Sequence, residues 1–176
     1  MSDRPIGCLL SGGVDSSIIA AVLAKYYKGI GKNIKTFSIG FPDSTDLKYA
    51  RIVAEHLGTD HHELVVTYED ALKRIPDVIR DIESNDITTI RASVGMYLLS
   101  EYIAKNFEET VIFSGEGSDE LLAGYLYFHY ADSPEALEAE SLRLVKNLPY
   151  YDVLRSDRCT ATHGLELRVP FLDRNF

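Results

Sequence analysis

Short apolar runs alternate with longer segments of helical periodicity along most of this sequence, and this alternation is its strongest constraint on the fold. Strands are predicted at residues 6–10, 35–40, 61–66 and 110–113, and helices at residues 16–28, 45–57, 68–82 and 93–106. Thr67 and Asp70 have the spacing of a capping box at the start of the third helix. Because strands separated by a helix pair in parallel through right-handed crossovers, the pattern predicts a doubly wound α/β domain, with helices on both faces of a parallel sheet.

The alternation of strands and helices stops near residue 126. Helices are predicted at residues 134–145 and 150–161, and no strand is predicted in this part. We therefore divide the chain into an α/β core, residues 1–125, and a C-terminal helical extension, residues 126–176. The last nine residues do not complete an element, so we expect the chain to be truncated.

The composition fits one globular domain. Hydrophobic residues make up 45% of the 176 residues, which is enough for a core of ordinary size. No apolar run reaches the roughly 18 residues that a membrane span requires, so we expect a soluble, cytoplasmic protein with no membrane partner. The formal net charge of −9 argues against a nucleic-acid partner, because phosphate backbones are bound by clustered Lys and Arg.

Several residues that often mark other functions are expected to be structural here. Cys8 and Cys159 are too few for a disulfide framework, and Cys8 lies in an apolar run typical of a buried thiol. His61 and His62 would point to opposite faces of a strand, with no cysteine cluster in the sequence, so we predict no zinc site. The aromatic segment at residues 125–130 is expected to pack rather than to stack on nucleic-acid bases.

Two of the predicted strands run into glycine-rich loops. The first loop, SGGVDSS, occupies residues 11–17, and the second, SGEGSDE, occupies residues 114–120. In open α/β sheets, ligands bind outside the carboxyl ends of the strands, where the winding direction reverses. If the first and fourth strands are neighbours at that point, the two loops flank one crevice.

The first loop has the features of an anion site. Gly12 and Gly13 allow backbone N–H groups to approach a phosphate, and the next helix points its positive end at the same place. The loop lacks the lysine of the common phosphate loop, so it suits a phosphate that a divalent cation partly neutralises. Asp15 and Asp119 are the expected Mg²⁺ ligands, because a carboxylate beside a phosphate needs a cation between them. The alternative is that each aspartate caps a helix.

Glu116 and the segment at residues 86–91 are the other candidates. Glu116 stands between two glycines, where the backbone can fold close to a ligand, although an exposed turn residue would have the same sequence context. The segment at residues 86–91 offers hydroxyl groups and the guanidinium of Arg91, which would suit a carboxylate ligand. The alternative there is a helix cap followed by a surface arginine.

The first glycine-rich loop and several longer segments together resemble a known family. The loop at residues 11–17 resembles the pyrophosphate loop of the ATP pyrophosphatases, which cleave ATP between the α and β phosphates. The segments FSIG, HLGTDHHEL, DITTIRAS, SGEGSDELLAGYLYFH and GLELRVPFLD resemble the synthetase domain of the glutamine-hydrolysing asparagine synthetases, over nearly the whole chain. The resemblance implies a fold like that of the adenine nucleotide alpha hydrolases.

The resemblance also implies a reaction and a set of residue roles. In that family the side-chain carboxylate of aspartate attacks the α-phosphorus of ATP, giving β-aspartyl-AMP and pyrophosphate, and ammonia then displaces AMP. The implied ATP contacts are Leu10, Ser11, Gly12, Gly13, Asp15, Ser16, Ser17, Ile39, Ser114 and Gly115, with Asp15 and Asp119 on Mg²⁺. The implied catalytic residues are Glu116, Arg91 and Asp152, and the implied aspartate contacts are Thr89, Arg91, Asp152 and Arg155.

The chain departs from the family at both ends. Glutamine-dependent members begin with a glutaminase domain that carries a nucleophilic N-terminal cysteine, whereas this sequence opens with Met1 and Ser2. Ammonia would therefore come from solution or from a glutaminase domain or subunit. The family also continues past VPFLD to a lysine-bearing segment, so we expect incomplete activity from the isolated chain. A β-lactam-forming or peptide-cyclising synthetase, a non-catalytic ATP-binding remnant and a homodimeric assembly all stay open.

Overall fold

The structure, a computed structural model, describes residues 3–176; Met1 and Ser2 lie outside the described residues. Its strands are β1 (Ile6–Leu9), β2 (Lys35–Gly40), β3 (Asp60–Val65), β4 (Val111–Phe113) and β5 (Glu166–Arg168). Its α-helices are α1 (Val14–Gly29), α2 (Thr45–Leu57), α3 (Tyr68–Ile82), α4 (Ile87–Asn106), α5 (Ser118–Leu122), α6 (Pro134–Asn147) and α7 (Asp152–Ala161). Its 3-10 helices are η1 (Leu126–Tyr130), η2 (Leu148–Tyr150) and η3 (Pro170–Leu172).

The strands form one parallel sheet in the order β3-β2-β1-β4-β5. The chain moves outward from β1 to β3 and then crosses to the other side of β1 to form β4 and β5. The winding direction therefore reverses between β1 and β4, which pair in the register Gly7 to Ile112. This confirms both the doubly wound parallel sheet and the expected adjacency of the two strands that carry glycine loops.

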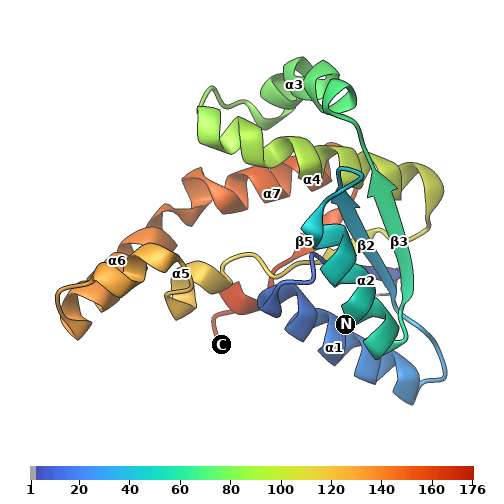
Figure 1. Cartoon of the computed structure of the whole chain (residues 1–176), viewed down its shortest axis with the longest axis horizontal. Coiled ribbons are helices and arrows are strands. Elements are labelled where there is room, and N and C mark those ends of the chain that lie inside the picture. The colour runs from blue at the N-terminus through green and yellow to red at the C-terminus, as the bar shows by residue number, and fades with distance from the viewer. Residues whose placement is uncertain (1–2) are drawn as a thin grey trace.

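Helices cover both faces of the sheet (Figure 1). The core on the α1 and α2 face contains Cys8, Leu10, Ile19, Ala20, Ala50, Ala54 and Phe171. The core on the α4 face contains Phe37, Leu99, Ile103, Ile112 and Leu165. A third cluster, of Val78, Ile82, Tyr97 and Cys159, joins α3 and α7 to α4. Residues of α1, α4 and α7 line a pocket at the carboxyl ends of the strands.

The two thiols are buried, as expected for Cys8. Burial raises the pKa of Cys8 to about 12 and that of Cys159 to about 11. Both thiols therefore stay protonated at neutral pH, and neither is activated as a nucleophile. Over residues 3–176, the helices are all too short or too polar to cross a bilayer.

Elements with strong local signals have the predicted bounds. The capping box at α3 is present, because Thr67 Oγ1 accepts from Asp70 N at 3.1 Å and the Asp70 carboxylate accepts from Thr67 N at 3.1 Å. The helix α2 ends at Leu57 and is capped by Gly58, whose φ of 65° is a left-handed conformation that glycine adopts without strain.

Two predictions were wrong. The helix α4 begins at Ile87 rather than near residue 93, because the Asp86 side chain caps it by accepting from Thr89 N at 2.8 Å. The helical extension contains α6 and α7 as expected, but it also contains β5, which pairs with β4. This strand has one apolar residue, Leu167, between two charged ones, so it lacks the apolar run by which the other strands were recognised.

Candidate active site

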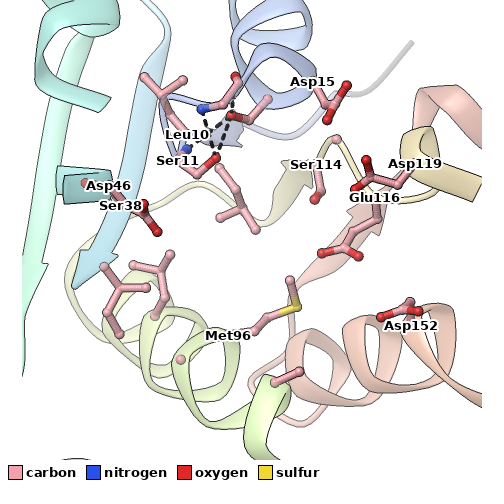
Figure 2. A pocket seen from close by; sticks show the side chains of 18 of the residues that line it. Leu10, Ser11, Asp15, Ser38, Asp46, Met96, Ser114, Glu116, Asp119 and Asp152 are labelled. Carbon is pink, nitrogen blue, oxygen red and sulfur yellow. Dashed lines mark hydrogen bonds between the residues drawn. The ribbon is translucent and has the colours of Figure 1, made fainter. Parts of the chain in front are cut away.

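A pocket of about 500 Å³ lies at the carboxyl ends of β1, β2 and β4 (Figure 2). The predicted site residues that line it are Leu10, Ser11, Gly13, Asp15, Ser16, Ile39, Ser114, Gly115, Glu116, Asp119, Asp152 and Arg155. Its wall opposite the loops is the face of α4 that carries Ala92, Gly95, Met96 and Leu99. Residues from both glycine loops and from the C-terminal extension therefore meet around one cavity.

The loop at residues 11–17, here called the anion loop, is held by its own hydroxyl groups. Ser16 Oγ accepts from Ser11 N at 3.2 Å and donates to Gly13 O at 3.2 Å. Ser17 Oγ donates to Gly13 O at 2.6 Å. In the described part of the chain no side chain caps the N-terminus of α1. The partial positive charge at this helix end is thus open to an anion in the pocket.

Two glycines fix the position of the anion loop. Gly12 has a φ of 82°, and a Cβ there would lie 2.5 Å from Ala50 N in α2. A Cβ on Gly115 would lie 2.9 Å from Ser16 N, so the second loop contacts the backbone of the first. Gly12 therefore serves the packing of the loop on α2 rather than the pocket lining, and Gly115 allows the two loops to meet.

Asp15 and Asp119 contribute carboxylates from the two adjoining loops. Burial and the negative charge of Asp15 raise the pKa of Asp119. The N-caps of α1 and α5 are Gly13 and Gly117, so the alternative that the two aspartates cap these helices is wrong. Gly124 makes room for this arrangement, since a Cβ there would lie 2.1 Å from Asp119 Oδ1.

A divalent cation fits this pair of carboxylates. Within residues 3–176 no group of three or more His, Cys, Asp or Glu side chains is arranged to hold a metal ion. Mg²⁺, however, is commonly held by one or two carboxylates together with substrate phosphates and water. Burial is the main cause of the raised pKa of Asp119, and the repulsion from Asp15 that adds to it is the kind that a bound cation would relieve.

Glu116, Asp152 and Arg155 form a second group, here called the charged cluster. Arg155 Nη2 lies 3.0 Å from Glu116 Oε2 and 2.9 Å from Asp152 Oδ1. The side chains of Glu116 and Arg155 are only 18% and 15% exposed, so Glu116 is not an exposed turn residue. Burial raises the pKa of Glu116, Arg155 opposes this, and Asp152 adds to it. The cluster therefore combines a buried carboxyl group with a cation.

Four predicted residues lie outside the pocket lining: Gly12, Ser17, Thr89 and Arg91. Thr89 is buried, and its N–H and hydroxyl both donate to Asp86 Oδ1; it lines an adjoining cavity together with Asp152 and Arg155. Arg91 is exposed and lines an apolar cleft between α3 and α4. The pocket-facing residues of α4 begin at Ala92, one residue after Arg91 and about 100° further around the helix. The roles of Thr89 and Arg91 stay predictions.

The pocket also contains residues that the sequence did not single out: Ser38, Asp46, Met96, Glu120 and Tyr125. The Tyr125 hydroxyl donates to the buried carboxylate of Glu120, and burial together with this carboxylate raises the pKa of Tyr125. Tyr125 was expected only to pack. Ser38 lies in β2 and Asp46 lies at the start of the helix that follows it. The carboxyl end of β2 faces the pocket, and this position was the signal that could have identified both residues.

Comparison with known proteins identifies the family. The sequence model of asparagine synthase matches residues 1–140 and 131–176. The chain belongs to the asparagine synthase family. It is 58% identical over 178 aligned residues to the asparagine synthetase [glutamine-hydrolyzing] of Bos taurus and 57% identical to that of Homo sapiens, covering 100% of this chain and 32% of each relative. The NH3-dependent NAD synthetase of Campylobacter jejuni has 18% identity and a TM-score of 0.48, over 96% of this chain and 90% of that chain.

Membership of the asparagine synthase family agrees with the resemblance found in the motifs. The matched residues include the anion loop, the second glycine loop and the charged cluster. The chain spans about a third of the length of the curated relatives that it matches. The residues that line the pocket described above therefore all lie within the part that matches the asparagine synthase family.

Proposed function

We propose that the chain forms the ATP-binding and aspartate-activating part of an asparagine synthetase. The observation that carries the proposal is a single pocket that joins an anion loop without lysine to a buried charged cluster. The relatives that are named asparagine synthetase [glutamine-hydrolyzing] support it. The overall reaction converts aspartate, ammonia and ATP into asparagine, AMP and pyrophosphate.

ATP would lie between the two glycine loops. Leu10, Ile39, Ser114 and Gly115 would contact the adenosine, and the phosphates would face the anion loop and the N-terminus of α1. Asp15 and Asp119 would hold Mg²⁺, which would neutralise charge on the leaving pyrophosphate. A carboxylate is a poor acyl donor, so the role of the nucleotide is to turn one carboxylate oxygen into a leaving group.

The first step forms an acyl-adenylate. A side-chain oxygen of aspartate forms a bond to the α-phosphorus, and the bond from that phosphorus to the bridging oxygen breaks, releasing pyrophosphate. The backbone N–H groups of the anion loop stabilise the charge that builds on the departing phosphates. Arg155, with Asp152, would orient the aspartate next to Glu116, and the Thr89 and Arg91 assignments on this side are also proposals.

The second step transfers nitrogen. Ammonia attacks the acyl carbon, the carbon–oxygen bond to AMP breaks, and the attacking nitrogen loses a proton. Glu116 would accept this proton, because burial raises its pKa and it lies in the second glycine loop, 3.0 Å from Arg155. The ammonia would come from solution or from glutamine hydrolysis by a glutaminase domain of the kind that the relatives' name indicates.

The proposal is tested with the full-length protein. Aspartate labelled with ¹⁸O in its side-chain carboxylate should transfer one labelled oxygen to AMP, and pyrophosphate release should depend on aspartate. Pyrophosphate release without transfer of the label would refute the acyl-adenylate route. Equal stimulation by larger amino-acid carboxylates would instead indicate a related adenylating synthetase, and ATP binding without release would indicate a non-catalytic protein.

A further inference from the structure

A series of polar side chains in contact with one another lies on the face of the sheet that α1 and α2 cover. Thr36 and Ser38 of β2 pair with His61 and Glu63 of β3 in the parallel register. Thr36 is fully buried and Ser38 is 4% exposed. The hydroxyls of Thr36 and Thr59 lie 2.8 Å apart, Thr36 Oγ1 lies 2.9 Å from His61 Nδ1, and Ser38 Oγ lies 3.2 Å from His61 Nε2.

His61 is the only ring in this chain of contacts, and both of its nitrogens have hydroxyl partners. Burial lowers the pKa of His61, and the nearby Glu63 opposes this shift. His61 is therefore neutral at neutral pH, so one nitrogen donates a hydrogen bond and the other accepts one.

The carboxylate of Glu63 favours a proton on His61 Nε2 over one on Nδ1. Its Oε1 lies 3.6 Å from His61 Nε2, too far for a hydrogen bond but close enough to favour a proton on that nitrogen. Arg51 holds this carboxylate through two hydrogen bonds of 3.0 and 2.6 Å. Nε2 then donates to Ser38, whereas Nδ1 accepts from Thr36 and Thr36 accepts from Thr59.

This assignment leaves the proton of Ser38 unused within the chain of contacts. Ser38 lines the candidate active-site pocket and precedes Ile39, which lines it as well. We infer that His61 is a positioning residue for the nucleotide site, and that it fixes the Ser38 hydroxyl as a hydrogen-bond donor to an acceptor atom of the bound ATP. The inference rests on the proposed function, because it takes ATP as the occupant of the pocket.

If His61 only stabilised the core, replacing it would affect folding, and its effect on ATP affinity would not depend on Ser38. A double-mutant cycle on Ser38 and His61 tests whether the two effects depend on each other. His61→Asn keeps a polar atom near Nδ1 and loses the contact with Ser38, whereas His61→Gln keeps a donor near Nε2. The affinity for Mg-ATP is measured by calorimetry on the full-length protein for the wild type, Ser38→Ala, His61→Asn and the double variant. Thermal unfolding is recorded for each.

Ser38→Ala and His61→Asn should each weaken ATP about fivefold, the usual size of one neutral hydrogen bond. The double variant should be no weaker than either single variant, and His61→Gln should keep most of the affinity. Thr59→Val is the matched control, because it removes the far end of the same chain of contacts and should change stability but not ATP affinity.

Losses that add in the double variant, or an unchanged ATP affinity in His61→Asn, would overturn the inference. A wild-type protein that does not bind ATP would overturn the proposed function and the inference together. If the wild type binds ATP but the losses of affinity in the Ser38 and His61 variants are independent of each other, the inference alone would be overturned.

Discussion

The anion loop and the charged cluster lie on the same pocket, but they are built in different ways. The anion loop consists of seven consecutive residues, and its hydrogen bonds join positions within residues 11–17. The charged cluster joins Glu116 to Arg155, which are 39 positions apart, and it exists only because α7 packs beside the second glycine loop. The loop offers backbone dipoles that are formed locally, whereas the cluster offers charges whose properties depend on burial.

This difference predicts different outcomes when each part is changed. Damage to the anion loop should weaken ATP binding, because the loop contributes positions of backbone atoms. Damage to the charged cluster should leave ATP in place and slow the chemistry, because the cluster contributes a proton acceptor and its counter-charge.

Glu116→Gln should have the largest effect. The amide keeps the size of the side chain but cannot accept the proton from the attacking ammonia, and a general base contributes roughly 10²–10⁴-fold to a rate. We expect asparagine formation to fall by about that factor while the calorimetric affinity for Mg-ATP changes little. A variant that forms asparagine at nearly the wild-type rate would exclude Glu116 as the base.

Gly115→Ala should mainly weaken nucleotide binding. Its Cβ would lie 2.9 Å from Ser16 N and 3.0 Å from Asp15 C, which are backbone atoms that cannot move away independently. Overpacking of this kind costs about 1–3 kcal/mol, so we expect ATP affinity to fall roughly tenfold or more.

Gly13→Ala is the matched control for that change. Gly13 has a φ of −71°, and a Cβ there would meet only Ser11 Oγ at 3.4 Å. Calorimetry should give an ATP affinity close to that of the wild type. If both alanine variants lose affinity equally, the close contact between the two loops is not what the nucleotide site requires.

Arg155→Gln should shift the pH dependence of the amidation step. Arg155 opposes the rise in the pKa of Glu116, so removing its charge should raise that pKa further. Glu116 must be ionised to accept a proton, and activity therefore increases as pH rises through this pKa. We expect the acidic limb of the rate profile to move to higher pH by about one unit, measured at a constant concentration of free ammonia. An acidic limb that does not move would mean that the ionisation of Glu116 does not control the amidation step, and activity that falls as pH rises through this pKa would mean that the protonated form is the active one.

The same contrast between local and distant contacts explains what the sequence predicted. The bounds of α2 and the capping box of α3 depend on neighbouring residues, and they were predicted correctly. The start of α4 was missed because Ile87, Thr88, Thr89 and Ile90 are β-branched and favour a helix only weakly, and the Asp86 cap outweighs this preference. The strand β5 was missed because it is formed by pairing at the sheet edge.

At the candidate active site, the sequence identified many of the residues but not which of them contact one another. The motif of the anion loop and the expected adjacency of the first and fourth strands predicted where the pocket lies. Glu116 and Arg155 were named separately, but no local pattern shows that they share an ion pair of 3.0 Å. Ser38 was missed because only its position near the carboxyl end of β2 marks it in the sequence, and its contact with His61 comes from the neighbouring strand.

Asp119→Asn should produce the smallest effect, a small change in the stability of the ligand-free protein. Whether this stability rises or falls distinguishes a functional carboxylate from a structural one. Burial and Asp15 raise the pKa of Asp119, so its ionised form destabilises the fold, and this cost appears as pH rises through that pKa. The free energy of unfolding of the variant should therefore exceed that of the wild type at neutral pH by no more than about 1 kcal/mol, seen as a slightly higher unfolding temperature. The difference should disappear in acid, and the variant should lose the Mg²⁺-dependent part of ATP binding. A variant that is less stable at neutral pH would mean that Asp119 supports the second loop, and the metal role would then have to be sought elsewhere in the pocket.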